Sequence, residues 1–184
     1  MRKDLGVKPC MYPEPVLIIG TYNKDGTPNA MNAAWGGIHQ DNQVYVCVDK
    51  SHKTAENLRK RRAFTLSIAN VDNIGACDYV GIESGNDVPD KFARAGFTET
   101  RSAFVDAPVI NELPLTIECK VISYEDEELI GEIMNVSADE SILTDGRVDV
   151  RKLRPITYDG FNRVYLAIGD EVGRAFSIGN SLRE

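Results

Sequence analysis

The chain has 184 residues, 42% of them hydrophobic and 27% charged, and it carries a formal net charge of -7. This length and composition predict one soluble globular domain, residues 1–184, with enough apolar material for a sizeable core. The acidic balance argues against a nucleic-acid partner, whose binding protein would present a basic surface, so any anion site must be a local positive feature.

The first half of the chain predicts strands interrupted by short helices. Residues 15–36 are typical of a hairpin, because Asp25-Gly26 supplies the positive φ that a tight turn needs. The further elements predicted from apolar periodicity are a strand over 44–48, a helix over 51–62, a strand over 64–69 and short helices over 72–80 and 87–96.

The second half predicts a long hairpin over residues 112–139, which turns at the acidic run 125–128, and a last strand over 163–169. The tail after it is expected to be a loop or a short helix. Six or seven strands joined mostly by hairpins, with two or three short helices, favour a mainly β protein built as a closed or nearly closed antiparallel barrel. A doubly wound parallel sheet is disfavoured, because strands and helices do not alternate regularly.

Cysteine and histidine usage argues against a metal site. The four cysteines form no CxxC pair, and only two histidines are present. Reduced thiols in a cytoplasmic protein are the simpler interpretation. The N-terminus has no apolar signal-peptide core and no apolar run is long enough to cross a bilayer, so we expect a cytoplasmic protein with no membrane partner.

The stretch DKSHKTAENL, residues 49–58, joins a predicted strand to a predicted helix and allows three interpretations. A Ser51 nucleophile activated by His52 is disfavoured, because adjacent side chains on a helix do not face each other and no G-x-S-x-G elbow is present. A purely structural interpretation makes Asp49 or Ser51 the helix cap, with the basic run 59–62 complementing the helix dipole.

The third interpretation is an anion site, and it is compatible with capping. The first turn of a helix offers unpaired N–H groups and the positive end of the dipole. Lys53 adds a full charge, and Ser51 and Thr54 add hydroxyl donors. Most of the binding energy for a phosphate would come from charge-assisted hydrogen bonds.

A second stretch, TPNAMNAAWGG at residues 27–37, is rich in small residues and amides. Such a backbone lets a flat ring approach closely. Asn29 and Asn32 could read carbonyl and N–H edges, and Trp35 could cover a ring. The structural alternative is a barrel strand with a glycine bend and a core tryptophan.

Three other residues are expected to have no chemical role. Cys47 alternates with valines, which favours buried packing over redox chemistry. Glu118 and Glu132 are expected on solvated strand faces.

Five segments in order resemble the flavin reductase-like family of flavoredoxin-type proteins. The segments are PEPVLIIGTYNKDGTPNAMNAAWGG, VCVDKSHKTAENL, ESGNDVPDKFARAGF, APVINELPLTIECKV and GEIMNVSAD. The resemblance covers roughly residues 10–175 of the chain. It implies an FMN-binding split β-barrel with antiparallel, Greek-key-like connections, and a homodimer with one FMN per subunit near the subunit interface.

The resemblance also implies the site residues. The isoalloxazine ring would be lined by Asn29, Met31, Asn32, Ala33, Ala34 and Trp35. The ribityl chain and phosphate would be held by Asp49, Ser51, His52, Lys53, Thr54 and Asn57. Lys91 matches a lysine that approaches the flavin. Some relatives have Ser or Thr where this chain has Asn32 or Ala33, so contacts to the flavin N5 and O4 edge would differ.

The implied activity is hydride transfer from NAD(P)H to flavin N5, with no catalytic protein nucleophile. Because flavin carries this chemistry, the protein residues would bind and orient it. No G-x-G-x-x-G fingerprint follows a strand, so the nicotinamide would stack on the exposed flavin face. One alternative is a non-enzymatic FMN protein that a redox protein partner reduces; another is a barrel for a different anionic ligand, such as heme or a deazaflavin.

Overall fold

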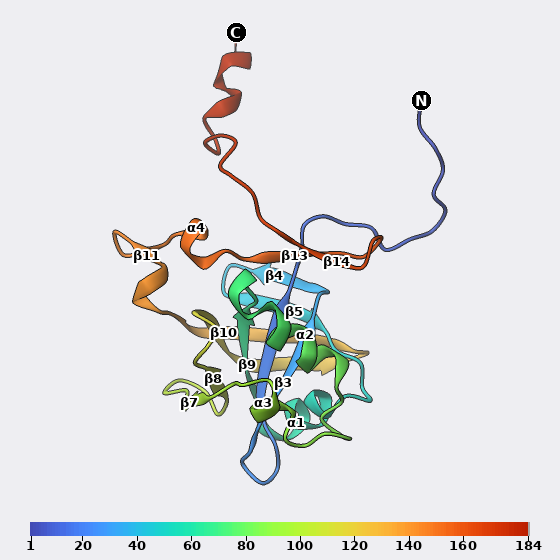
Figure 1. Ribbon diagram of the computed structural model, residues 1–184, viewed down its shortest axis with the longest axis vertical. Coiled ribbons are helices and arrows are strands. Elements are labelled where there is room, and N and C mark those ends of the chain that lie inside the picture. The colour runs from blue at the N-terminus through green and yellow to red at the C-terminus, as the bar shows by residue number, and fades with distance from the viewer. Residues whose placement is uncertain (184) are drawn as a thin grey trace.

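The computed structural model describes residues 1–183, and its body is organised around one antiparallel sheet of seven strands. The strand order is β3-β2-β6-β9-β10-β5-β4, which leaves β3 and β4 as the two edges of a curled, open barrel (Figure 1). The bounds are β2 Leu17–Tyr22, β3 Pro28–Ala33, β4 Gly36–Gln40, β5 Gln43–Cys47, β6 Ala63–Ile68, β9 Leu115–Glu125 and β10 Glu128–Ala138. The predicted mainly β, antiparallel fold class is therefore confirmed.

Three small sheets complete the described chain. The first has the order β1-β13-β14, and the other two are the pairs β7-β8 and β11-β12. Their bounds are β1 Glu14–Pro15, β13 Ile156–Asp159, β14 Val164–Ala167, β7 Glu99–Arg101, β8 Pro108–Ile110, β11 Leu143–Thr144 and β12 Arg147–Val148. The sequence prediction missed all of them except β14, because strands of two to four residues carry too few alternations to be seen.

Both predicted hairpins are confirmed. The turn between β2 and β3 has Gly26 at φ 87°, and the turn between β9 and β10 has Asp126 and Glu127 at φ 48° and 68°. In the β9-β10 turn, left-handed conformations at both central residues match the right-handed twist of the flanking strands. β4 was not predicted, because its sequence GGIHQ lacks a clear apolar alternation.

The helices are α1 Lys53–Arg61, α2 Ile74–Ile82, α3 Lys91–Arg94 and α4 Val150–Leu153, with 3-10 turns η1 Val71–Asn73, η2 Glu140–Ile142 and η3 Ile178–Leu182. The first two α-helices lie where predicted. The predicted helix over 87–96 contracts to the four residues of α3, and Gly96 follows it at φ 79°. A single turn cannot stabilise itself, so packing holds α3 in place.

β2 lies between the two larger of the three hydrophobic cores, because every one of its residues is buried. Leu17 and Ile19 face one core, inside the curl of the sheet, with Phe64 and Leu66 of β6. Ile18 faces the other core, against α2, together with Val80. Because β2 is buried on both faces, the β2-β3 hairpin is held in place by packing on each side.

Two expectations about single residues are wrong. Glu118 is only 2% exposed, and it accepts hydrogen bonds from Asn135 Nδ2 at 2.7 Å and from the Ser102 hydroxyl. It lies on β9, a central strand, and Ser102 belongs to the segment between β7 and β8. Cys47 is exposed rather than buried, because β5 ends there beside the turn at Glu128.

The two terminal segments extend away from the body (Figure 1). Residues 1–12 and 168–183 are exposed throughout. The first segment is anchored where the Tyr12 hydroxyl donates to Asp159 Oδ1 at 2.6 Å. Over residues 1–183, no helix has both the length and the apolar character that a membrane crossing requires.

Candidate functional site

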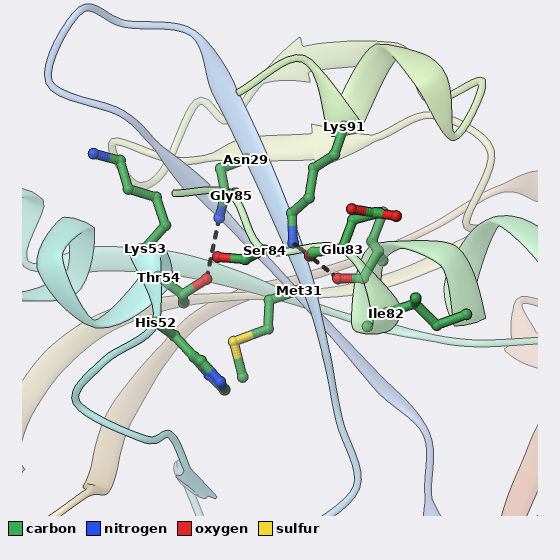
Figure 2. Close-up of a pocket in the computed structure, with 12 residues that line it drawn as sticks. Asn29, Met31, His52, Lys53, Thr54, Ile82, Glu83, Ser84, Gly85 and Lys91 are labelled. Atoms are coloured by element: carbon green, nitrogen blue, oxygen red, sulfur yellow. Dashed lines mark hydrogen bonds between the residues drawn. The ribbon is translucent and has the colours of Figure 1, made fainter. Parts of the chain in front are cut away.

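A pocket of about 130 Å³ lies between the start of α1, strand β3 and the C-terminal end of α2 (Figure 2). We call it the first pocket. Six of the predicted site residues line it: Asn29, Met31, His52, Lys53, Thr54 and Lys91. They come from three separate stretches of the sequence. The fold brings these stretches together in one pocket.

Strand β3 is an edge strand, since only β2 pairs with it. Its outer edge therefore has backbone N–H and C=O groups without a strand partner. Successive side chains of a strand point to opposite faces. Asn29 and Met31 accordingly line the first pocket, whereas Asn32 and, just past the strand, Ala34 line a second pocket on the other side of Gly81 and Ile82.

The start of α1 is open to a ligand. The N-cap is His52, with φ -73° and ψ 147°, and its side chain makes no capping hydrogen bond. The His52 carbonyl accepts from Ala55 N at 3.0 Å, so the amides of Lys53 and Thr54 are the ones that an α-helix leaves without a carbonyl partner. The predicted cap is wrong: the Asp49 carboxylate accepts from Ser51 N at 2.8 Å and from Ser51 Oγ at 2.6 Å, and this bond lowers the pKa of Asp49.

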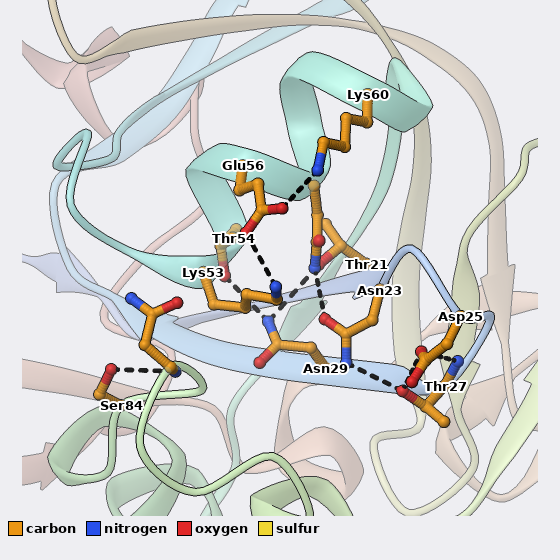
Figure 3. A network of polar contacts seen from close by, with 12 residues as sticks. Thr21, Asn23, Asp25, Thr27, Asn29, Lys53, Thr54, Glu56, Lys60 and Ser84 are labelled. Carbon is orange, nitrogen blue, oxygen red and sulfur yellow. Dashed lines mark hydrogen bonds and ion pairs between the residues drawn. The ribbon is translucent and has the colours of Figure 1, made fainter.

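Two lysines of α1 lie at this corner. Lys53 Nζ lies 2.8 Å from Glu56 Oε2, and Lys60 pairs with the other oxygen of the same carboxylate (Figure 3). Hydrogen bonds from Lys53 and then Lys60 lower the pKa of Glu56 to about 2. Asp25, whose pKa is lowered by its bonds to Thr27 and also by Lys53, is a further acidic group near this corner. Lys53 is the one of the two lysines that lines the first pocket.

A buried polar network fixes α1 to the β2-β3 hairpin (Figure 3). Asn29 Nδ2 donates to Thr54 Oγ1 at 3.1 Å. Asn57, which is 1% exposed, donates to Thr21 Oγ1 at 3.1 Å and to Asn23 Oδ1 at 2.9 Å. Asn57 lines neither of the two pockets, so the structure gives it a supporting position rather than a place at the pocket wall.

Lys91 is a buried cation at the end of α2. It is 3% exposed, and its Nζ donates to Val80 O at 2.9 Å and to Glu83 O at 2.7 Å (Figure 2). Burial lowers the pKa of its ammonium group to about 8. An ammonium has three N–H donors. Two of them are used by these carbonyls, so the third is available to an acceptor in the first pocket.

The other predicted residues lie outside the first pocket. Ala33 packs in the core inside the sheet. Trp35 is 57% exposed and lines neither pocket, so the alternative of a core tryptophan is wrong. Asp49 and Ser51 are exposed at the approach to α1, where the Ser51 carbonyl accepts from Asn86 Nδ2 at 3.0 Å.

The sequence interpretation missed the segment 80–85, which forms one wall of the first pocket. Two glycines allow its close approach. A Cβ on Gly85 would lie 2.5 Å from Asn29 Oδ1, and a Cβ on Gly81 would lie 2.9 Å from Asn32 Cβ. The dipeptide Ser84-Gly85 after an apolar helix was the available signal, but nothing in the sequence places it against β3.

Known proteins share both the sequence and the architecture. A family model described as the flavin reductase like domain matches residues 10–159. The flavoredoxin of Desulfovibrio vulgaris (Miyazaki F) is 40% identical, with a TM-score of 0.93 over 97% of this chain and 100% of that one. The flavoredoxin from Methanosarcina acetivorans is 27% identical, with a TM-score of 0.87 over 99% and 98%. An FMN-binding domain of a flavin reductases-like enzyme from Shewanella baltica OS155, 22% identical with a TM-score of 0.78 over 88% and 89%, shares the fold.

Proposed function

Because the chain belongs to the flavin reductase-like family, we propose that it binds FMN and acts as an oxidoreductase that uses NAD(P)H. The observation that carries this proposal is the first pocket, where the open start of α1 meets the free edge of β3. One end of this site suits a phosphate and the other suits a flat heterocycle. The relatives named as flavoredoxins and as an FMN-binding domain support the same ligand.

The phosphate end of FMN fits the start of α1. The first-turn amides, the Thr54 hydroxyl and the Lys53 ammonium are donors that lie around one corner. Thr54 Oγ1 accepts from Asn29, which leaves its own hydrogen free to donate. Lys53 would exchange its bond to Glu56 for a bond to phosphate, while Lys60 stays with that carboxylate.

The ring end of FMN fits the edge of β3. A flavin ring carries alternating carbonyl and N–H groups, and an edge strand offers backbone groups of both kinds. Met31 supplies an adaptable apolar surface within the first pocket. The third N–H of Lys91 is available for a ring carbonyl or for negative charge on the ring.

When bound, FMN would supply the hydride chemistry, by accepting a hydride from the nicotinamide of NAD(P)H. The residues of this chain would hold the ring, orient it and exclude water from one side. A protein nucleophile has no support at this corner, because the Ser51 hydroxyl donates to Asp49 rather than to His52. We propose a binding role, and no catalytic role, for the site residues named here. The same holds for Asp49, Ser51, Asn57 and Trp35.

We also propose a homodimer. The terminal segments extend away from the body (Figure 1). They expose large apolar side chains within residues 1–183, among them Leu5, Val7, Met11, Val172, Phe176 and Leu182. Exposed apolar side chains in such number suit a protein–protein interface. A second copy of the chain is the partner that the family resemblance implies.

Purification of the protein with FMN, followed by an assay with NADH and with NADPH, tests the activity. A flavin absorption spectrum and oxidation of either nicotinamide, with free FMN or ferricyanide as acceptor, are expected. A flavin spectrum without turnover by either nicotinamide would contradict the reductase proposal. Reduction by a redox protein alone would then favour the non-enzymatic electron carrier, and a heme or deazaflavin spectrum would contradict FMN itself.

Lys53 and Lys60 offer a matched pair for the binding site. Both bond to Glu56, but only Lys53 lines the first pocket. Lys53→Ala is expected to weaken FMN binding by about 1.5–3 kcal/mol, the range for a hydrogen bond to a charged group. Lys60→Ala is the control and should change FMN affinity far less. Equal effects in a fluorescence titration would contradict the placement of the phosphate at α1.

A further inference from the structure

The second pocket has a volume of about 380 Å³ and lies between α2, the end of β3 and the small sheet of β13 and β14. Aromatic and aliphatic side chains form most of its wall. The rings of Tyr158 and Tyr165 lie with centroids 5.8 Å apart at an interplanar angle of 51°, and Val16, Ala34 and Ile82 add apolar surface. Such a wall suits a planar ring, because aromatic side chains pack well against flat groups.

Arg163 places a guanidinium at this pocket. The guanidinium forms no ion pair or side-chain hydrogen bond within residues 1–183. The carboxylate in the same pocket belongs to Asp78, whose Oδ1 accepts from the Tyr165 hydroxyl at 2.7 Å. The pocket therefore holds one cation and one carboxylate that do not pair with each other, and the guanidinium keeps its donors for a ligand.

The backbone of Arg163 is held in an ordered turn. Its amide donates to Asp159 O at 2.8 Å, and its φ is 55°. The Asp159 carboxylate accepts from the amides of Phe161 at 3.0 Å and Asn162 at 3.2 Å, which orders the turn between β13 and β14. An ordered turn loses little backbone freedom when a ligand binds, and it holds the base of the arginine side chain at the rim of the pocket.

We propose that the second pocket binds a planar organic acid, with its ring against the tyrosine and aliphatic wall and its carboxylate on Arg163. A guanidinium matches the two oxygens of a carboxylate with a pair of parallel hydrogen bonds. The second pocket shares Gly81 and Ile82 with the first. The proposed function places FMN along β3. If that placement holds, the acid lies beside the flavin ring, and this part of the inference rests on the proposed function.

Calorimetry with benzoate tests the proposal on the full chain, both loaded with FMN and free of flavin. Benzoate should bind, and the neutral benzamide should bind at least ten times more weakly. Arg163→Gln should weaken benzoate about ten- to hundredfold, which corresponds to the loss of a charge-assisted hydrogen bond, and Arg163→Lys should have a smaller effect. Arg147→Gln, an exposed arginine on β12, is the control and should leave the affinity unchanged.

Three results would overturn the proposal. They are no benzoate binding in either form, equal affinity for benzoate and benzamide, and an unchanged affinity in Arg163→Gln. The proposed function fails by a different result, namely no uptake of FMN. A protein that binds benzoate through Arg163 but takes up no FMN would refute the flavin site and support the acid site. A protein that takes up FMN but binds no benzoate would refute the acid site and leave the flavin site standing.

Discussion

The corner at the start of α1 and the two terminal segments differ in how their side chains are accommodated. At the corner, buried polar groups from β2, β3 and α1 bond to one another, and no buried side-chain nitrogen or oxygen within residues 1–183 lacks a partner. The terminal segments make few contacts with the body and expose large apolar side chains instead. One region satisfies its polar groups within this chain, whereas the other leaves apolar side chains exposed, which is the observation behind the proposed dimer.

This contrast separates two kinds of stability. Unpaired buried polar groups are costly, so the closed network at the corner should hold the hairpin and the helix in one arrangement. Burial of apolar area drives association between chains. Changes at the corner should therefore alter the free energy of unfolding and ligand binding, and changes in the terminal segments should alter assembly.

Removal of the residues after Ala167 should have the largest effect of the changes considered, and it acts on the terminal segments. The segment 168–183 exposes Val172, Phe176, Ile178 and Leu182. Full burial of one such side chain is worth about 1.5–3 kcal/mol, so their combined loss should raise the dissociation constant of the dimer by about a thousandfold or more. Light scattering during gel filtration measures the mass. A full-length chain that is already monomeric at high concentration would contradict the assignment of these segments to a partner.

Asn57→Ala should have the next largest effect, and it acts on the corner. The change removes the donor to Thr21 and Asn23 and leaves a small buried cavity. We expect a loss of about 2–3 kcal/mol in the free energy of unfolding, measured by urea denaturation. Asn42→Ala, at an exposed position before β5, is the control. An Asn57 variant as stable as this control would show that the network does not hold the corner together.

Two glycines of α2 test how closely the pocket wall packs on β3. A Cβ at Gly75 would have nothing within 4 Å, whereas a Cβ at Gly81 would lie 2.9 Å from Asn32 Cβ. Gly75→Ala should stabilise the protein by up to about 1 kcal/mol through helix propensity. Gly81→Ala should destabilise it by about 1 kcal/mol through overpacking. Melting temperatures that rise equally in both variants would mean that α2 can move away from β3 at little cost.

The last prediction is a pH dependence from Lys91. Burial lowers the pKa of this group from 10.5 to about 8, so the unfolded chain keeps its proton to higher pH than the folded chain. The unfolded state binds more protons across this window, and the contribution of Lys91 to stability therefore rises with pH between about 8 and 10.5. Denaturation midpoints across this range should rise less in Lys91→Met than in the wild type. Parallel curves for the two proteins would contradict the buried ammonium.

Local signals predicted the elements of the fold but not all of their surroundings. The Asp25-Gly26 turn and the alternation of β9 and β10 operate over a few residues, so both hairpins were predicted correctly. Cys47 and Glu118 were assigned to the wrong environments. Alternation tells which residues share a face, but it does not tell what covers that face or where a neighbouring strand ends.

The candidate site shows the same division. The order of polar, charged and small residues in 27–37 and 49–58 predicted a phosphate corner next to a flat surface. His52, Lys53 and Thr54 of that corner line the first pocket with Asn29 and Met31, whereas its other predicted residues lie outside it. The sequence did not reveal that side chains of β3 alternate between two pockets, that Arg163 lies at the second, or that the segment 80–85 forms a wall.

The sequence by itself determined the hairpins, the position of the first helix and the family, because each depends on neighbours along the chain or on motif order. Only the tertiary structure decided that β3 is an edge strand, that α2 packs closely on it, and that residues 158–165 face Asn32 across a pocket. These features depend on strand order and on contacts between segments far apart in sequence. Their energies come from packing and buried hydrogen bonds, which a local pattern does not encode.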